Sequence, residues 1–227
     1  MPASGDGFTS ALFADPSAAL DTMPAQQVLA PGALLMHGFA SPQAAELLRD
    51  LQAVLAIAPL RHLVTPGGLA MSVAMSNCGP LGWSSDRKGY RYEQVDPDNG
   101  RPWPLMPASF RQLAARAAAE AGFAAFDPDA CLINCYAPGA RLSLHQDRDE
   151  RDFSQPIVSV SLGLPAVFLF GGRSRSEKPA RVLLNHGDVV AWGGASRLRF
   201  HGVLALQDGQ HALTGRCRFN LTFRRAG

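Results

Sequence analysis

CLINCYAPGARLSLH, residues 131–145, marks the point at which the hydrophobic pattern of the chain changes its period from near four to two. Alternation of apolar and polar residues is typical of β-strands, and the Pro138-Gly139 pair predicts a turn between two of them. Further strand-like runs follow at short spacing, at 157–163, 166–170, 180–185, 188–192, 198–204 and 217–224. Roughly eight short strands after two helices predict an α+β fold that is mainly β, an antiparallel sandwich or jelly roll with N-terminal helices.

Two helices are predicted in the N-terminal half. Residues 41–59 have an amphipathic pattern, and Ser41 is expected to cap the first turn of that helix. Residues 106–123 are rich in alanine, and Gly122 is expected to end the second helix. The intervening residues 64–106 are rich in Gly, Pro and aromatic residues, which predicts an irregular lid or binding loop.

The composition is that of a globular protein, with 227 residues of which 47% are hydrophobic and 18% charged. Residues 1–24 lack periodicity, so we expect a flexible N-terminal arm before a single domain at 25–227. The net charge is only +2, so contact with nucleic acid must come from local basic patches. Four cysteines without CxxC spacing favour a reducing cytosol, and neither a signal peptide nor a membrane-spanning run is recognisable. We expect a cytoplasmic protein that works as a monomer.

His145 and Asp147 stand two residues apart at the end of a strand-like run, so their side chains point to the same face. Two histidines and one carboxylate can bind Fe(II) and leave its other coordination positions open. His201 lies inside the strand-like run 198–204 and is the candidate third ligand. The alternative is a solvated charged turn, the reading that we keep for Arg148, Glu150 and Arg151.

The last strand-like run, 217–224, places Arg218, Asn220, Thr222 and Arg224 on one face and apolar residues on the other. This polar face predicts either ordinary solvent exposure or a site for a dicarboxylate, because guanidinium groups bind carboxylates through two hydrogen bonds. The run spans about 20 Å, so both arginines reach one small ligand only by leaning inward.

Taken together, His145-x-Asp147, His201 and Arg218-x5-Arg224 resemble the Fe(II)/2-oxoglutarate-dependent dioxygenases. MSNCGPLGW at 75–83, HGDVVAWGG at 186–194 and SRLRFHG at 196–202 resemble, more narrowly, the AlkB family of nucleic-acid repair demethylases. The resemblance covers most of residues 30–227 in the same order.

The resemblance implies a double-stranded β-helix, or jelly roll, at about 130–225, capped by a nucleotide-recognition lid at about 64–106. It implies Fe(II), 2-oxoglutarate and O2 as cofactor and co-substrates, with His145, Asp147 and His201 as the metal ligands. The expected contacts to 2-oxoglutarate are Asn134, Tyr136, Arg218, Asn220 and Arg224.

Residues 77–92, NCGPLGWSSDRKGYRY, interleave aromatic and basic residues, which suits base stacking combined with phosphate contact. The alternative is a loop whose aromatic residues cover the core. The resemblance implies that Trp83 stacks on the damaged base, Tyr90 binds a backbone phosphate and Asp149 approaches the exocyclic edge of the base. It also implies that Met75 lines the pocket. Arg175, in a charged segment at 171–181, is a further expected phosphate contact.

The function that follows is oxidative removal of methyl groups from N1-methyladenine and N3-methylcytosine, with release of formaldehyde, succinate and CO2. The expected partner is DNA, single-stranded or with a flipped damaged base, and RNA is a further candidate. No catalytic residue is expected beyond the metal ligands. The alternatives are the same chemistry on methylated RNA or on a lipid or protein, and a non-catalytic jelly roll that binds nucleic acid.

Overall fold

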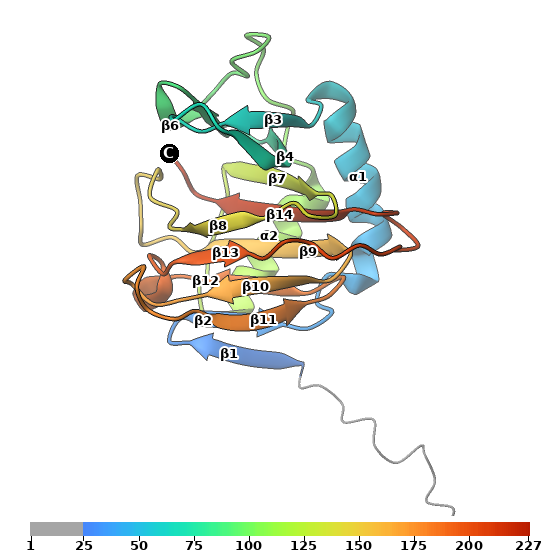
Figure 1. Cartoon of the computed structure of the whole chain (residues 1–227). Helices are drawn as coiled ribbons and strands as arrows, with labels where there is room; N and C mark the ends of the chain where they lie inside the picture. The colour runs from blue at the N-terminus through green and yellow to red at the C-terminus, as the bar shows by residue number, and fades with distance from the viewer. Residues whose placement is uncertain (1–24) are drawn as a thin grey trace, which may run out of the picture.

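The computed structural model describes residues 25–227, and the predicted N-terminal arm at 1–24 lies outside the described residues. Two antiparallel sheets face each other, as expected for a jelly roll (Figure 1). The larger, eight-stranded sheet has the order β1 (Gln26–Ala30), β2 (Ala33–Met36), β12 (Val189–Trp192), β9 (Ile157–Gly163), β14 (Arg218–Arg224), β7 (Ala130–Tyr136), β4 (Ala70–Cys78) and β3 (Arg61–Val64). The smaller, four-stranded sheet has the order β11 (Ala180–Leu184), β10 (Ala166–Phe170), β13 (His201–Val203) and β8 (Leu142–His145).

Alternation along the central strands of the larger sheet separates two hydrophobic cores. In β14, Leu221 and Phe223 face the helices, where they pack with buried residues of α1 and α2. The polar residues of β14 face the smaller sheet and are buried, with Arg218 only 1% exposed. The period-two pattern therefore confirms the predicted strand, but its polar face lies inside the sandwich and is not exposed to solvent.

Both predicted helices are present and cover the outer face of the larger sheet (Figure 1). The first is α1 (Ala44–Ile57), preceded by a 3-10 turn, η1 (Ser41–Gln43). The expected cap by Ser41 is wrong, because its hydroxyl donates to the carbonyl of His186, 3.5 Å away. The second helix, α2 (Ala108–Glu120), ends two residues before Gly122, whose φ of +85° favours glycine and suits the predicted stop. No helix among residues 25–227 is long and apolar enough to cross a membrane.

Every strand predicted from residue 131 onward is present, as β7 to β14, and a second 3-10 turn, η2 (Gly194–Ser196), precedes β13. The prediction that residues 64–106 are irregular is wrong for much of the segment. β4 pairs with β7 in the larger sheet, and β5 (Gly82–Asp86) forms a hairpin with β6 (Gly89–Glu93). The sequence of β4, AMSVAMSNC, is poor in β-branched residues, so pairing with β7 stabilises it more than local propensity does.

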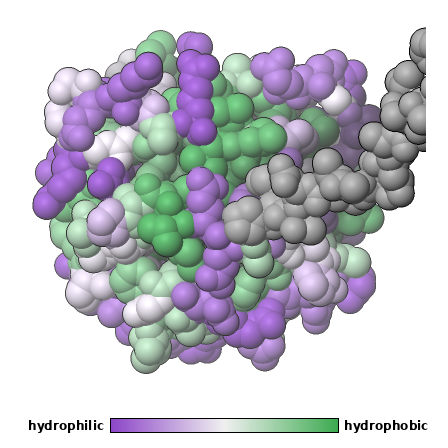
Figure 2. All heavy atoms as spheres, turned by 90° about the horizontal axis from the view of Figure 1, so that it is seen from below, coloured by the Kyte–Doolittle hydropathy of each residue, from purple (hydrophilic) through white to green (hydrophobic). Residues whose placement is uncertain are grey.

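Hydrophobic and hydrophilic residues are interleaved on the face seen from below β1 (Figure 2). Val28 on β1 is 73% exposed and Leu183 on β11 is 55% exposed, and both strands are edge strands. Singly exposed apolar side chains are usual on a globular surface, so we assign no binding site to them.

Candidate metal centre

The structure brings His145, Asp147 and His201 together between the two sheets. His145 ends β8, His201 begins the neighbouring β13, and the two residues are register partners. The Nε2 atom of His145 lies 3.7 Å from Asp147 Oδ1, and that of His201 lies 3.8 Å from Asp147 Oδ2. One donor atom from each of the three side chains lies within 4.8 Å of the others. Sheet pairing thus supplies the ligand that is distant in sequence.

Backbone carbonyls orient both imidazole rings. The Nδ1 atom of His145 lies 2.8 Å from the carbonyl oxygen of Ser143, and that of His201 lies 3.1 Å from the carbonyl oxygen of Arg199. An Nδ1–H that donates to a carbonyl leaves the Nε2 lone pair directed at the site. Burial, aided by the neighbouring His145, lowers the pKa of His201 to about 4, so this ring is neutral near pH 7.

Asp147 is held as a carboxylate by a buried arginine. Arg224 donates to Asp147 Oδ2 from Nε at 2.9 Å and from Nη2 at 2.7 Å. Burial alone would raise the pKa of Asp147, but Arg224 and the two histidines outweigh it and lower that pKa below its usual range. Two imidazole nitrogens and one carboxylate are the ligand set that suits Fe(II) with open coordination positions, so these residues fit the metal.

Glu150 belongs to this network and not to the solvated turn that the sequence predicts. It is 6% exposed, and its carboxylate accepts from Tyr92 Oη at 2.8 Å and from Arg197 Nη2 at 2.9 Å. Arg224 Nε also lies 3.2 Å from Glu150 Oε1. A buried acid is tolerated when arginines pair with it, and here two of them do.

Arg197 is a second buried residue that the sequence does not identify. Its guanidinium donates to the backbone carbonyl of Asp147 and to that of Gln155, both at 3.0 Å, in addition to Glu150. Arg197 therefore connects the two ends of the loop at 147–155, which begins at the metal ligand Asp147. In sequence it stands in SRLRFHG, two residues before Arg199, and no local pattern distinguishes it from a surface charge.

Arg218 fits an acidic ligand. It is buried, its Nη2 atom donates to Ser161 Oγ at 2.9 Å, and its Nε and Nη1 atoms have no hydrogen-bond partner among residues 25–227. The guanidinium lies over the ring of Tyr136, 5.1 Å from its centroid. Burial lowers the pKa of Arg218, and no carboxylate among residues 25–227 pairs with it to offset that effect. A buried cation with free donors calls for an anion, as the carboxylate of 2-oxoglutarate would provide.

The other residues expected to contact 2-oxoglutarate surround Arg218 and Arg224 on adjacent strands. Asn134 and Asn220 are register partners on β7 and β14, and Asn134 Oδ1 is buried without a partner among the described residues. Asn220, in contrast, donates to Ser159 Oγ at 2.7 Å and accepts from Thr222 at 2.9 Å. Nη1 of Arg224 makes no hydrogen bond to the described residues, although Nε and Nη2 are engaged by Asp147.

A cavity of about 890 Å³ opens above the triad, and all the predicted substrate contacts line it: Met75, Trp83, Tyr90, Asp149 and Arg175. Trp83 and Tyr90 stack with ring centroids 5.5 Å apart, and the Trp83 Nε1–H donates to Asp149 Oδ2 at 2.8 Å. Met75 is buried, and the Arg175 guanidinium lies 5.9 Å from the centroid of the Phe200 ring. The cavity thus joins the metal ligands to the aromatic residues of the hairpin.

Comparison with known proteins identifies the class that this fold and centre define. The family model of the 2OG-Fe(II) oxygenase superfamily matches residues 32–224, and the chain belongs to that family. It is 58% identical to the alpha-ketoglutarate-dependent dioxygenase AlkB of Escherichia coli K12, over 91% of this chain and 96% of that relative. The AlkB protein of Salmonella typhimurium is 57% identical, over 91% and 95% respectively.

A solved structure, that of OsALKBH1, has a TM-score of 0.76 and 30% identity, and the match covers 88% of this chain and 99% of that one. Alpha-ketoglutarate is 2-oxoglutarate. This chain is therefore a dioxygenase that uses Fe(II) and 2-oxoglutarate, with His145, Asp147 and His201 as its iron-binding triad.

Proposed function

We propose that this dioxygenase is a DNA repair demethylase that removes methyl groups from N1-methyladenine and N3-methylcytosine. One observation supports this substrate most directly: the cavity that holds the triad is also lined by Trp83 and Asp149, which are hydrogen-bonded to each other. An indole can stack on a base, and a carboxylate beside it can accept hydrogen bonds from an exocyclic amino group.

The carboxylate of 2-oxoglutarate binds in this proposal to Arg218, with Asn134 and Tyr136 beside it and Nη1 of Arg224 available as a further donor. Arg224 holds Asp147 ionised and oriented, and Nδ1 bonds to the backbone orient both histidines. When bound, iron with 2-oxoglutarate and O2 supplies oxidation of the methyl C–H bond, and the products are formaldehyde, succinate and CO2. The protein positions the reactants and excludes water.

Methylation at adenine N1 or cytosine N3 leaves a cationic ring with an amino group beside the methylated nitrogen. Asp149 is placed to accept from that amino group and to offset the positive charge, while Trp83 covers one face of the base. Both lesions block Watson–Crick pairing, so they cost less to flip out of a duplex than a paired base, which costs a few kcal/mol.

Residues 64–106 act in this proposal as the nucleotide-recognition lid of a single domain at 25–227, and Tyr90 and Arg175 contact backbone phosphates. Tyr90 is 46% exposed at the edge of the cavity, which supports that role. The four cysteines are free, which supports a reducing cytoplasm, and we propose that the enzyme acts there as a monomer.

Mass spectrometry of single-stranded oligonucleotides after incubation with enzyme, Fe(II) and 2-oxoglutarate tests the proposal. DNA and RNA of one sequence would each carry N1-methyladenine, N3-methylcytosine or no modification. We expect loss of the methyl group from both modified DNA strands and none with Asp147→Ala. If only the RNA strands lost their methyl groups, methylated RNA and not DNA would be the substrate. Robust turnover by Asp147→Ala would contradict the ligand assignment.

A further inference from the structure

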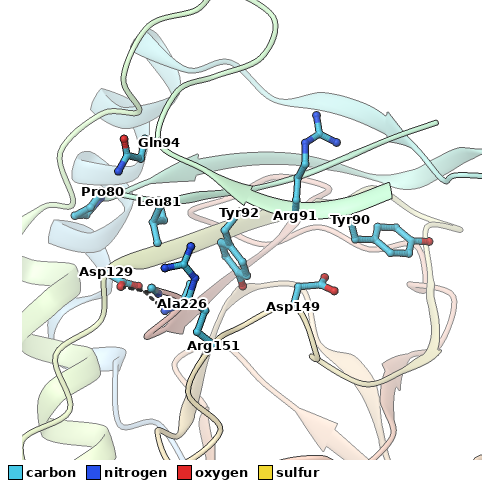
Figure 3. A pocket seen from close by; sticks show the side chains of 11 residues that line it. Pro80, Leu81, Tyr90, Arg91, Tyr92, Gln94, Asp129, Asp149, Arg151 and Ala226 are labelled. Atoms are coloured by element: carbon cyan, nitrogen blue, oxygen red, sulfur yellow. Dashed lines mark hydrogen bonds between the residues drawn. The ribbon is translucent and has the colours of Figure 1, made fainter. Parts of the chain in front are cut away.

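A second cavity, of about 490 Å³, adjoins the active-site cavity beneath strand β6 of the β5–β6 hairpin (Figure 3). The hairpin supplies one wall, and the loop after β8 and the residues that follow β14 supply the other. Three residues line both cavities: Tyr90, Tyr92 and Asp149. The residues that line only this second cavity include Leu81, Arg91, Asp129 and Arg151. Its volume is in the range usual for small-ligand sites.

Most charged groups of this second cavity are already engaged. Arg91 pairs with Asp86 at 2.9 Å and with Glu93 at 3.0 Å. Asp129 accepts from the backbone N–H groups of Ala226 and Gly227, at 2.6 and 3.1 Å. Asp149 accepts from Trp83 in the neighbouring cavity. Arg91 and Asp129 therefore leave little charge for a ligand, and Asp149 is the residue that faces the methylated base in the proposed function.

Arg151 is different. Its backbone N–H donates to the carbonyl of Ala226 at 3.2 Å, which fixes the position of the residue. Its guanidinium makes no hydrogen bond or ion pair with any residue in the described range 25–227, and Figure 3 shows it directed into the cavity, toward Leu81. An exposed cation anchored by its backbone, with free donors and no ion-pair partner among residues 25–227, suits a phosphate.

We propose that the second cavity binds the nucleotide next to the flipped methylated one, with Arg151 on its backbone phosphate. This rests on the proposed function, because it assumes that the methylated base occupies the cavity above the triad. The shared residues Tyr90 and Asp149 then lie between two consecutive nucleotides of one strand. Pro80, Leu81 and Tyr92 offer an apolar and aromatic wall for the sugar or base, which suits contact without sequence preference.

Activity should therefore depend on whether the substrate extends beyond the methylated nucleotide. A methylated nucleoside monophosphate fills only the cavity above the triad, so loss of the Arg151 side chain should not affect its turnover. A dinucleotide extended on the correct side, or a pentanucleotide, reaches Arg151 and should be affected.

The test compares wild type, Arg151→Ala and the matched control Arg49→Ala. Arg49 is an exposed residue of α1, on the far side of the larger sheet, so the control removes the same charge away from both cavities. The substrates are N1-methyldeoxyadenosine monophosphate, the two dinucleotides that extend it on either side, and a pentanucleotide with a central N1-methyladenine. kcat/KM is measured from formaldehyde release, with thermal melting of each variant as the check on folding.

We expect Arg151→Ala to lower kcat/KM roughly threefold to tenfold for the pentanucleotide and for one dinucleotide only, and to leave the monophosphate unchanged. For the pentanucleotide, a plot of log kcat/KM against the logarithm of the salt concentration should be less steep for Arg151→Ala than for wild type. The slopes should differ by about 0.7, the contribution of one phosphate contact on a single strand. Arg49→Ala should match wild type. Equal losses on all four substrates, or no loss on the pentanucleotide, would overturn the assignment.

Binding without turnover separates this inference from the proposed function. Fluorescence anisotropy measures the affinity for an unmethylated pentanucleotide without turnover. Arg151→Ala should bind this strand more weakly than Arg49→Ala does, by a similar factor. If wild type binds the strand in this way but releases no formaldehyde from the methylated one, the chemistry fails while the Arg151 contact stands. Equal affinity of the two variants refutes the contact whatever the chemistry.

Discussion

Replacing Arg197 with methionine should destabilise the protein and weaken its metal site, because Arg197 holds the backbone of the metal ligand Asp147. Its guanidinium forms hydrogen bonds with the backbone of Asp147, the backbone of Gln155 and the carboxylate of Glu150. Methionine fills much of the same volume but satisfies none of these acceptors. The variant therefore isolates the electrostatic contribution of the guanidinium.

The magnitude follows from burial. Arg197 is 2% exposed and Glu150 is 6% exposed, and removing one partner of a buried ion pair costs about 3–5 kcal/mol. Glu150 keeps Tyr92 and Arg224 as neighbours, so we expect the lower end, about 3 kcal/mol. For a domain of this size that corresponds to a fall in Tm of roughly 6–12 °C.

The assay is thermal and urea unfolding of the metal-free enzyme, together with titration of Mn(II) as a redox-stable probe of the triad. Arg197→Lys serves as the matched control, because it keeps the charge but cannot make all three hydrogen bonds, and it should lose less stability than Arg197→Met. The double variant Arg197→Met/Glu150→Met should recover part of the loss, since it removes both buried charges. A loss below about 1 kcal/mol, or no recovery in the double variant, would refute the reasoning.

Three further outcomes are expected. Arg218→Lys should raise the KM for 2-oxoglutarate about tenfold or more without changing Mn(II) affinity, because lysine keeps the charge but loses the paired donors; an unchanged KM would place the co-substrate elsewhere. Trp83→Ala should raise the KM for a methylated oligonucleotide roughly fivefold to a hundredfold, which corresponds to the loss of one base-stacking interaction. The KM for 2-oxoglutarate should not change, and Trp83→Phe should retain most of the affinity for the oligonucleotide. Mn(II) at a hundred times its Kd should raise the Tm of the metal-free enzyme by roughly 5–11 °C, with no shift in His145→Gln; an equal shift in that variant would contradict the triad.

The sequence predicts the C-terminal sheets well because their information is local. Each strand from β7 to β14 follows from alternation between Gly and Pro, and the same alternation places the side chains of β14 on opposite faces. His145 and Asp147 follow from their spacing of two. His201 requires the pairing of β8 with β13, which a single strand cannot reveal, and the family resemblance identifies it.

What the sequence could not predict depends on contacts that are distant along the chain. β4 has little local preference for a strand and is fixed by pairing with β7. Glu150 and Arg197 look like surface charges in their own segments, but they are buried together as an ion pair, and Arg224 also lies beside Glu150. The different roles of Arg218 and Arg224 also come from surroundings, since only Arg224 meets a carboxylate of the protein.

The most direct test of the central claim is the stoichiometry of the reaction on a DNA oligonucleotide that carries one N1-methyladenine. Formaldehyde, succinate and unmodified adenine would be measured together after incubation with wild-type enzyme, Fe(II), 2-oxoglutarate and O2. We predict equal amounts of all three, and none of them from His145→Gln or in the absence of iron. Succinate that forms while the methylated base stays intact would contradict the claim, because the enzyme would then oxidise a different substrate.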